Sequence, residues 1–258
     1  MKTLNHTAVV FPEPELEFAC GQKMDHPAIG LTLFGPVEGQ GIEAPGRVAY
    51  AVIGTEEGIA SFKGFAESIN RPIAPPEGKS DILWPHFPGF EEAMHATFPA
   101  TPPWTEVIDA AALKEAVSEP DDHQRVYRVT NLYLDAIKVL AQKDATVDVA
   151  ICVVPELVYK NCRPQSKVAS TEGRKRPVSS ERRLRRQFVD LFHSYDSESY
   201  DFSLDFRRQI KARAMEHKMA IQIIRDTTLR LSDETVFGQR GLTCLSDRAW
   251  NLSTAFLY

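Results

Sequence analysis

The chain has 258 residues, of which 43% are hydrophobic and 25% charged, a composition typical of one large globular domain or slightly more. Its net charge of -5 excludes a globally basic surface, although a local basic patch remains open. The four cysteines lack CxxC spacing and the N-terminal segment lacks a long apolar run, so we expect reduced thiols, no zinc site, no membrane contact and a cytoplasmic protein.

The first half of the chain predicts the start of an α/β fold. Residues 14–37 hold apolar stretches separated by Gly and Pro, and we expect strand, turn and strand there. Residues 48–53 predict a buried strand, followed by a helix that ends near Ile69. Because residues 71–103 hold eight prolines, we expect an irregular excursion with at most one short helix, around 89–97.

The middle of the chain continues the alternation of strands and helices. Residues 104–109 predict a strand and 110–117 a short helix, and the clearest helix is 121–143, with apolar residues at every third or fourth position. The runs 147–155 and 219–224 are continuously apolar, which is typical of central strands of a parallel sheet covered on both faces. The pattern therefore predicts a Rossmann-like α/β fold with a parallel, doubly wound sheet.

A basic segment separates the last two predicted strands. We expect residues 161–180 to form a mobile loop and 180–195 an amphipathic helix with its arginines outward. This segment could line the path of a nucleic-acid backbone, or it could be a solvated loop, as charge runs usually are. Its basic residues are Lys160, Arg163, Lys167, Arg174, Lys175, Arg176, Arg182, Arg183, Arg185 and Arg186.

Two cations one helical turn apart mark the candidate site. Arg207 and Lys211 lie near the start of a helix capped by Ser203 or Asp205, where unpaired N–H groups and the macrodipole favour an anion. Gln222 lies in the middle of the following strand and could reach the same pocket from the sheet. A solvated helix face gives the same spacing without any ligand, so the pattern alone leaves both interpretations open.

This pattern, R-x3-K followed by a Gln eleven residues after the Lys, is similar to the 5′-phosphate-binding motif of the Argonaute MID domain. Further stretches resemble short prokaryotic Argonautes in the same chain order. These stretches are "PELEF" with "GLTLFGPV" at the opening, "DVAICVVPE" before the phosphate-binding helix, "MAIQIIRDTTL" at the Gln strand and "WNLSTAFLY" at the helix that opens the PIWI domain.

The resemblance implies a role for each matching residue. Arg207, Lys211 and Gln222 would hold the guide 5′-phosphate, with Mg²⁺ as an additional ligand of that phosphate. Tyr200 and Phe202 would stack on the 5′ nucleotide, although anchoring of the loop in the core is the more common role of aromatic residues at loop ends.

The resemblance also implies a domain organisation. Arg182, Arg183 and Arg186 would contact the backbone from an insertion, about 156–203. The family's last motif lysine and the rest of PIWI are not in this sequence, so we expect a truncated chain. The implied units are N-terminal strands packing with the PIWI lobe at 1–44, the MID domain at 45–245 and the start of PIWI at 246–258.

The implied function is guide binding for target recognition in prokaryotic immunity, with no catalytic residue in this chain. The implied partners are a guide RNA or DNA, a complementary target DNA, and an effector protein with an Argonaute-PAZ-like region fused to a Sir2, TIR or nuclease domain. Two alternatives stay open from the residues themselves. One is a doubly wound enzyme that binds a nucleotide or a phosphorylated small molecule, and the other is an interaction module whose basic insertion binds a partner.

Overall fold

The fold is α/β and is built on one parallel sheet. The computed structural model describes residues 14–37, 46–78, 84–143, 146–164, 199, 202–231 and 244–257. The described strands of the sheet run in the order β4-β3-β5-β6, and every neighbouring pair is parallel. These strands are β3 (Tyr50–Gly54), β4 (Trp104–Val107), β5 (Val149–Val154) and β6 (Ile221–Arg225). The parallel α/β architecture predicted from the sequence is therefore confirmed.

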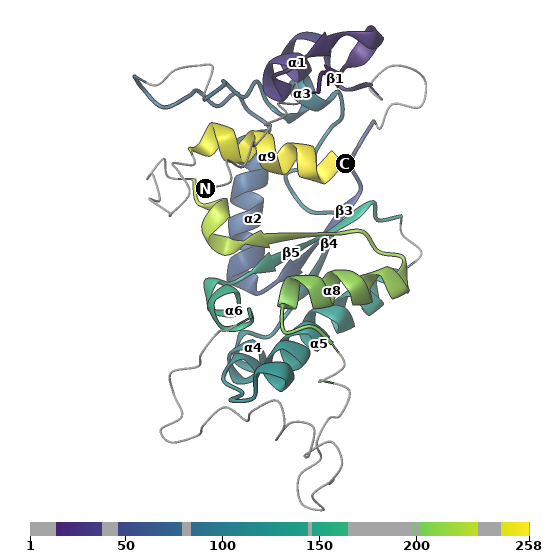
Figure 1. Cartoon of the computed structure of the whole chain (residues 1–258), viewed down its shortest axis with the longest axis vertical. Helices are drawn as coiled ribbons and strands as arrows, with labels where there is room; N and C mark the ends of the chain where they lie inside the picture. The colour runs from purple at the N-terminus through teal and green to yellow at the C-terminus, as the bar shows by residue number, and fades with distance from the viewer. Residues whose placement is uncertain are drawn as a thin grey trace, which may run out of the picture.

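Helices cover both faces of the sheet, as Figure 1 shows. The first face packs against α2 (Glu56–Ile69) and α9 (Leu245–Leu257), while the second packs against α4 (Ala110–Val117), α5 (Asp122–Ala141) and α8 (Phe206–Ala214). Side chains of Thr55, Asp109, Asp121 and Asp205 accept hydrogen bonds from backbone N–H groups in the first turns of four of these helices. All eleven residues of β3 and β5 are buried, because these two strands lie in the middle of the sheet under both helix layers.

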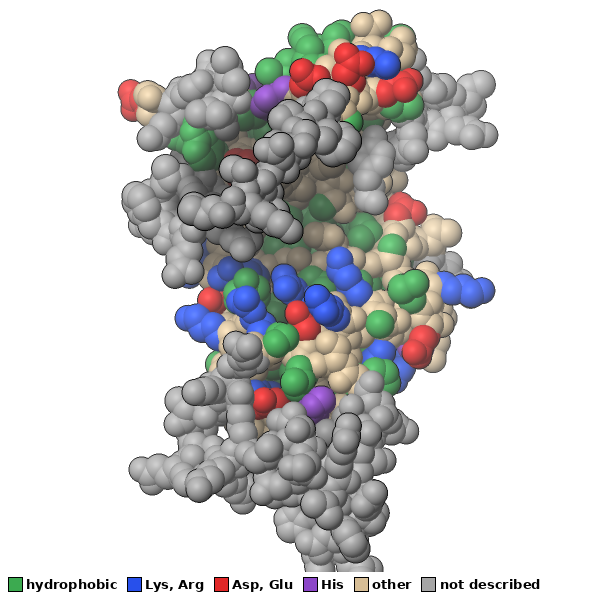
Figure 2. Space-filling model, in the orientation of Figure 1, with side chains coloured by type: hydrophobic (Ala, Val, Ile, Leu, Met, Phe, Trp, Pro, Cys, Tyr) green, Lys and Arg blue, Asp and Glu red, His purple; other side chains and the backbone are tan. Residues whose placement is uncertain are grey.

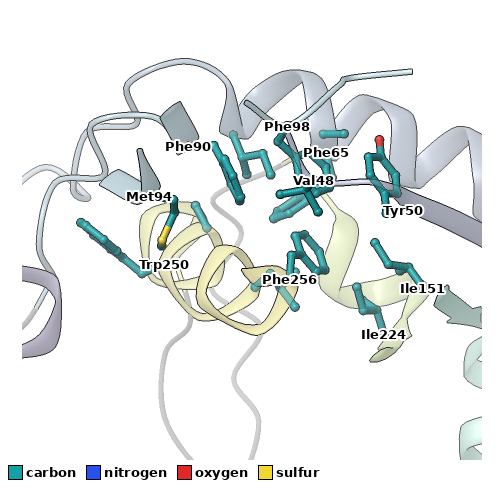
Figure 3. Packing of buried hydrophobic residues seen from close by; sticks show 14 of the residues in the cluster. Val48, Tyr50, Phe65, Phe90, Met94, Phe98, Ile151, Ile224, Trp250 and Phe256 are labelled. Atoms are coloured by element: carbon teal, nitrogen blue, oxygen red, sulfur yellow. The ribbon is translucent and has the colours of Figure 1, made fainter. Parts of the chain in front are cut away.

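The first face holds a core rich in aromatic rings (Figure 3). The Phe98 ring stacks on Tyr50 at 4.4 Å and on Phe256 of α9 at 5.2 Å between ring centroids. Trp250, also on α9, meets Phe87 edge to face at 5.0 Å and donates from its indole Nε1 to the backbone oxygen of His86. The excursion between β3 and β4 is thus tied to the sheet through α9, and its short helix α3 (Phe90–Met94) lies where one was predicted.

The prediction for the N-terminal segment is wrong in its second half. Two short antiparallel strands form, β1 (Leu16–Glu17) and β2 (Lys23–Met24), but the expected strand in "GLTLFGPV" belongs to helix α1 (Pro27–Phe34). The physical reason is local. His26 caps the helix by accepting from the N–H of Ile29, Pro27 occupies the first helical position, and Gly35 ends the helix at a φ of 74°.

The rest of the predicted elements agree closely with the structure, apart from one short helix that was not predicted. That helix, α6 (Glu156–Asn161), follows β5 directly through Pro155. Three short 3-10 helices complete the described elements: η1 (Ala19–Gly21), η4 (Met215–His217) and η5 (Asp226–Leu229). The predicted basic helix at 180–195 lies outside the described residues. Within them, no helix is both long and apolar enough to cross a membrane.

Candidate functional site

A pocket of about 210 Å³ lies at the carboxyl ends of β5 and β6, the usual place for ligands in open α/β sheets. Its walls come from α6, the start of α8, η5 and α9, so segments far apart in the chain build it together. Its lining residues are Val154, Val158, Tyr159, Cys162, Arg163, Phe206, Arg207, Ile223, Ile224, Arg225, Thr228 and Leu252.

The parallel topology brings the start of α8 to this edge of the sheet. Since α8 leads back to the beginning of β6, its own N-terminus lies at the carboxyl end of β5, next to α6. The N–H of Phe206 donates to the backbone oxygen of Cys162 at 3.1 Å, although 44 positions separate the two residues. The Asp205 carboxylate accepts from the N–H of Arg207 at 3.0 Å and so orders the first turn of α8.

Arginines form the charged part of the pocket lining. Arg225, the last residue of β6, donates from Nε and Nη2 to Glu156 Oε2 at 3.2 and 2.6 Å. Its guanidinium carbon lies 3.9 Å from the centroid of the Tyr159 ring, and that of Arg163 lies 4.5 Å from the same centroid. Glu156 is also 3.7 Å from the ammonium of Lys160. Lys and Arg side chains gather in a band across this part of the surface (Figure 2).

Of the three predicted phosphate ligands, only Arg207 lines the pocket. Its side chain is 53% exposed, and its Nε lies 3.6 Å from the Asp205 carboxylate. Lys211 is exposed one turn further along α8 and is not among the lining residues. Gln222 is half-buried on the face of β6 that points away from α8. Its neighbours Ile221 and Ile223 pack towards α8, whereas Ile224, which shares the face of Gln222, packs towards α2. The structure thus does not bring the three side chains together in this pocket.

Phe202 lies away from the pocket lining, between α5 and α8. Its ring stacks on Tyr127 at 5.8 Å, and the guanidinium of Arg213 lies 4.7 Å from its centroid. These contacts fit the alternative in which Phe202 anchors the loop before α8. Tyr200 and the three arginines predicted to contact a backbone, Arg182, Arg183 and Arg186, lie outside the described residues.

Tyr159 and Arg225 were not predicted from the sequence as site residues, and Arg163 was predicted only as a member of the basic segment. Arg225 could have been found from its sequence position, because it directly follows the apolar run of β6 and therefore stands at the carboxyl edge of the sheet. Tyr159 could not, since helix α6 was not predicted, and the position of Arg163 beside it depends on the end of the same helix.

The pocket lining favours anions over metal ions. It includes no carboxylate, and no group of three or more His, Cys, Asp or Glu suited to a metal ion occurs in the part of the chain that the structure describes. Burial raises the pKa of the Cys162 thiol to about 12, so this lining residue stays neutral at physiological pH and adds no negative charge. The same cause raises the pKa of Cys152 to about 12. None of the four cysteines, all of which lie in the described residues, forms a disulfide bond.

Comparisons with known proteins add no assignment. The chain matches no protein-family model, and a search of curated proteins finds no match either. The pocket, its charges and the motif resemblance are therefore the features that indicate a function for this chain.

Proposed function

We propose that this chain binds the phosphorylated 5′ end of a guide nucleic acid, as the MID domain of a catalytically inactive short prokaryotic Argonaute does. The observation that carries the proposal is an arginine-lined pocket at the carboxyl edge of a parallel sheet, beside the first turn of α8. Guanidinium groups bind phosphate through paired hydrogen bonds, and a helix N-terminus adds favourable dipoles.

The size of the pocket supports a terminal group over a whole small molecule. Sites for cofactors and drug-sized ligands have about 300–1,000 Å³. A pocket of about 210 Å³ suits a phosphate with part of its sugar, while the rest of a strand stays outside. This comparison disfavours the alternative of a doubly wound enzyme that encloses a nucleotide.

The proposal gives Arg207 and Lys211 different tasks. Arg207 lines the pocket and takes the terminal phosphate. Lys211 is exposed one turn along the same helix, so its flexible ammonium can meet a later phosphate of the strand. Gln222, on the other face of β6, has no direct contact with the phosphate in this proposal.

The same resemblance supplies the wider setting. The guide, RNA or DNA, would pair with a target DNA, and base pairing would provide the sequence specificity. An effector protein with an Argonaute-PAZ-like region, fused to a Sir2, TIR or nuclease domain, would carry the enzymatic activity in prokaryotic immunity. Because the charged lining residues of the pocket are arginines, its donor set does not fit Mg²⁺, and the proposal gives that ion no role.

Oligonucleotide binding tests the proposal directly. Two fluorescent strands of one sequence, with a 5′-phosphate and a 5′-hydroxyl, are titrated with the protein, and unlabelled strands of decreasing length then compete. We expect the phosphorylated strand to bind at least tenfold more tightly, because charge-assisted hydrogen bonds contribute roughly 1.5–3 kcal/mol. Equal binding of both strands contradicts the proposal, and full competition by a mononucleotide supports the enzyme instead.

Arg207→Ala and Arg208→Ala form a matched pair for this assay. Both arginines are exposed on the same turn of α8, and each substitution removes one positive charge, but only Arg207 lines the pocket. Arg207→Ala should therefore reduce the preference for the 5′-phosphate about tenfold, while Arg208→Ala leaves that preference unchanged. Equal effects of the two substitutions would assign the binding to general electrostatics.

A further inference from the structure

We propose that Arg225 is the second phosphate-holding side chain of the pocket, and that Arg207 and Arg225 grip the anion from the helix and from the sheet. This inference rests on the proposed function and names the residues of the same site. It also departs from the sequence motif, which assigns the contact from β6 to Gln222.

The alternation of side chains along β6 excludes a shared face for Gln222 and Arg225. Ile221 and Ile223 pack towards α5 and α8, whereas Ile224 packs towards α2 on the other face. Because side chains alternate along a strand, Gln222 lies on the same face as Ile224, and Arg225 lies on the same face as Ile223. Arg225 therefore points to the same side of the sheet as the start of α8, and it lines the pocket together with Arg207. The pocket also reaches the other face through Ile224 and Leu252, so the face has to be combined with the position along the strand to explain why Gln222 is not a lining residue.

The position of Arg225 along the strand gives a second reason. Gln222 is the second residue of β6 and pairs with Ile151 inside the sheet, whereas Arg225 is the last residue and pairs with Val154 at the carboxyl end of β5. At a rise of about 3.3 Å per residue, three residues place Gln222 roughly 10 Å further from the carboxyl edge. Ligands of parallel sheets bind at that edge.

The surroundings of Arg225 leave one side of its guanidinium for a ligand. Its Nε–Nη2 side donates to Glu156, and Tyr159 lies against its face. Within the described residues, no hydrogen bond uses Nη1. The fork formed by Nη1 and the second hydrogen of Nη2 can therefore donate to two phosphate oxygens while Glu156 keeps the side chain ordered. An arginine held in this way loses little side-chain entropy when the ligand binds.

A structural salt bridge between Arg225 and Glu156 is the competing explanation. In that case, substitution of Arg225 would lower the unfolding temperature and leave the preference for phosphate unchanged. Gln222→Ala provides the matched control, since it changes the same strand on its other face. Arg225→Lys provides a second variant, which keeps the charge beside Glu156 but removes the fork.

The experiment measures the affinity of the full chain and its variants for the 5′-phosphate and 5′-hydroxyl strands, together with unfolding temperatures. For Arg225→Gln we expect the ratio of the two affinities to fall at least tenfold, and for Arg225→Lys by a smaller factor. For Gln222→Ala we expect a change below twofold. A ratio that stays at the wild-type value in Arg225→Gln overturns the inference.

A second arm separates failure of this inference from failure of the proposed function. Inorganic phosphate is added to the wild type and to Arg225→Gln, and the unfolding temperature is followed, because a ligand of the folded state raises it. If the wild type does not distinguish the two strands, the guide-binding proposal fails, but stabilisation by phosphate that is lost in Arg225→Gln still supports the anion site. If phosphate does not stabilise the wild type, or if it stabilises both proteins equally, the inference that Arg225 holds the anion is overturned.

Discussion

Replacement of Phe256 by alanine tests whether α9 belongs to the cooperative core of the α/β unit. The Phe256 side chain is 3% exposed, stacks on Phe98 at 5.2 Å and meets the edge of Phe62 at 5.9 Å. The same helix contributes Leu252 to the pocket. If α9 is integral to the fold, the loss of one ring should destabilise the whole sheet, the pocket included.

The magnitude follows from the packing around the ring. Removal of a buried phenylalanine ring costs about 3–5 kcal/mol, of which transfer from water and the cavity left behind are the two parts. We expect a value near the lower limit, about 3 kcal/mol, because α9 contacts the sheet from outside and can shift partly into the cavity. With a urea dependence of about 2–3 kcal/mol per molar, the unfolding midpoint should fall by about 1 M or slightly more.

Urea denaturation followed by tryptophan fluorescence measures this shift, with Trp250 reporting from α9 itself. Asn251→Ala is the control on the same helix, because Asn251 is exposed and bonds only to Asp247 among the described residues. Its cost should stay below about 1 kcal/mol. A Phe256→Ala protein that loses less than about 1 kcal/mol, with unchanged urea dependence, would show that α9 unfolds independently and would refute the packing argument.

Three further predictions concern charge and thiols. Arg125→Met should lower the free energy of unfolding in urea by about 3 kcal/mol, because this 1%-exposed guanidinium donates to two backbone carbonyls and to the buried carboxylate of Asp122. The control Arg128→Met, which changes a half-exposed ion pair, should cost less than about 1 kcal/mol. A thiol reagent at pH 8 should modify the exposed Cys20 quickly and the three buried cysteines only after unfolding, and four rapid modifications in the native protein would contradict the burial. Burial raises the folded-state pKa of Cys152 and Cys162 to about 12 from 9. The contribution of these two thiols to stability is therefore complete below pH 9 and should be lost as pH rises towards 12. Urea unfolding midpoints measured across that pH range would show the loss.

The sequence predicted the sheet well because its central strands carry an unambiguous signal. β3 and β5 are buried on both faces, which requires continuous apolar runs, and such runs stand out against amphipathic neighbours. Helix α5 was equally clear, since 20 residues with one apolar side leave few alternatives. In both cases burial by itself dictates the residue pattern, so no knowledge of the neighbouring elements is needed.

Helix α1 was missed because a short apolar run fits a strand and a buried helix equally well. The deciding signals were the residues around the run. Pro27 cannot donate a hydrogen bond, which suits the first turn of a helix, and His26 before it supplies the cap. The α6 helix is a similar case, since six residues give too little periodicity to be recognised.

The candidate site separates what motif spacing can predict from what it cannot. The spacing of Arg207 and Lys211 fixes their relation on one helix, and Arg207 does line the pocket. Spacing does not fix which face of the next strand meets that helix, because a shift of one residue moves every side chain to the opposite face. The apolar neighbours resolve this point: Ile221 and Ile223 pack against the α8 side, so the polar residue on that side must be an odd-numbered one, Arg225 and not Gln222. Where the motif and the pleat of the strand disagree, we expect the pleat to determine which side chain reaches the α8 side, because the packing of the isoleucines on both faces fixes its geometry.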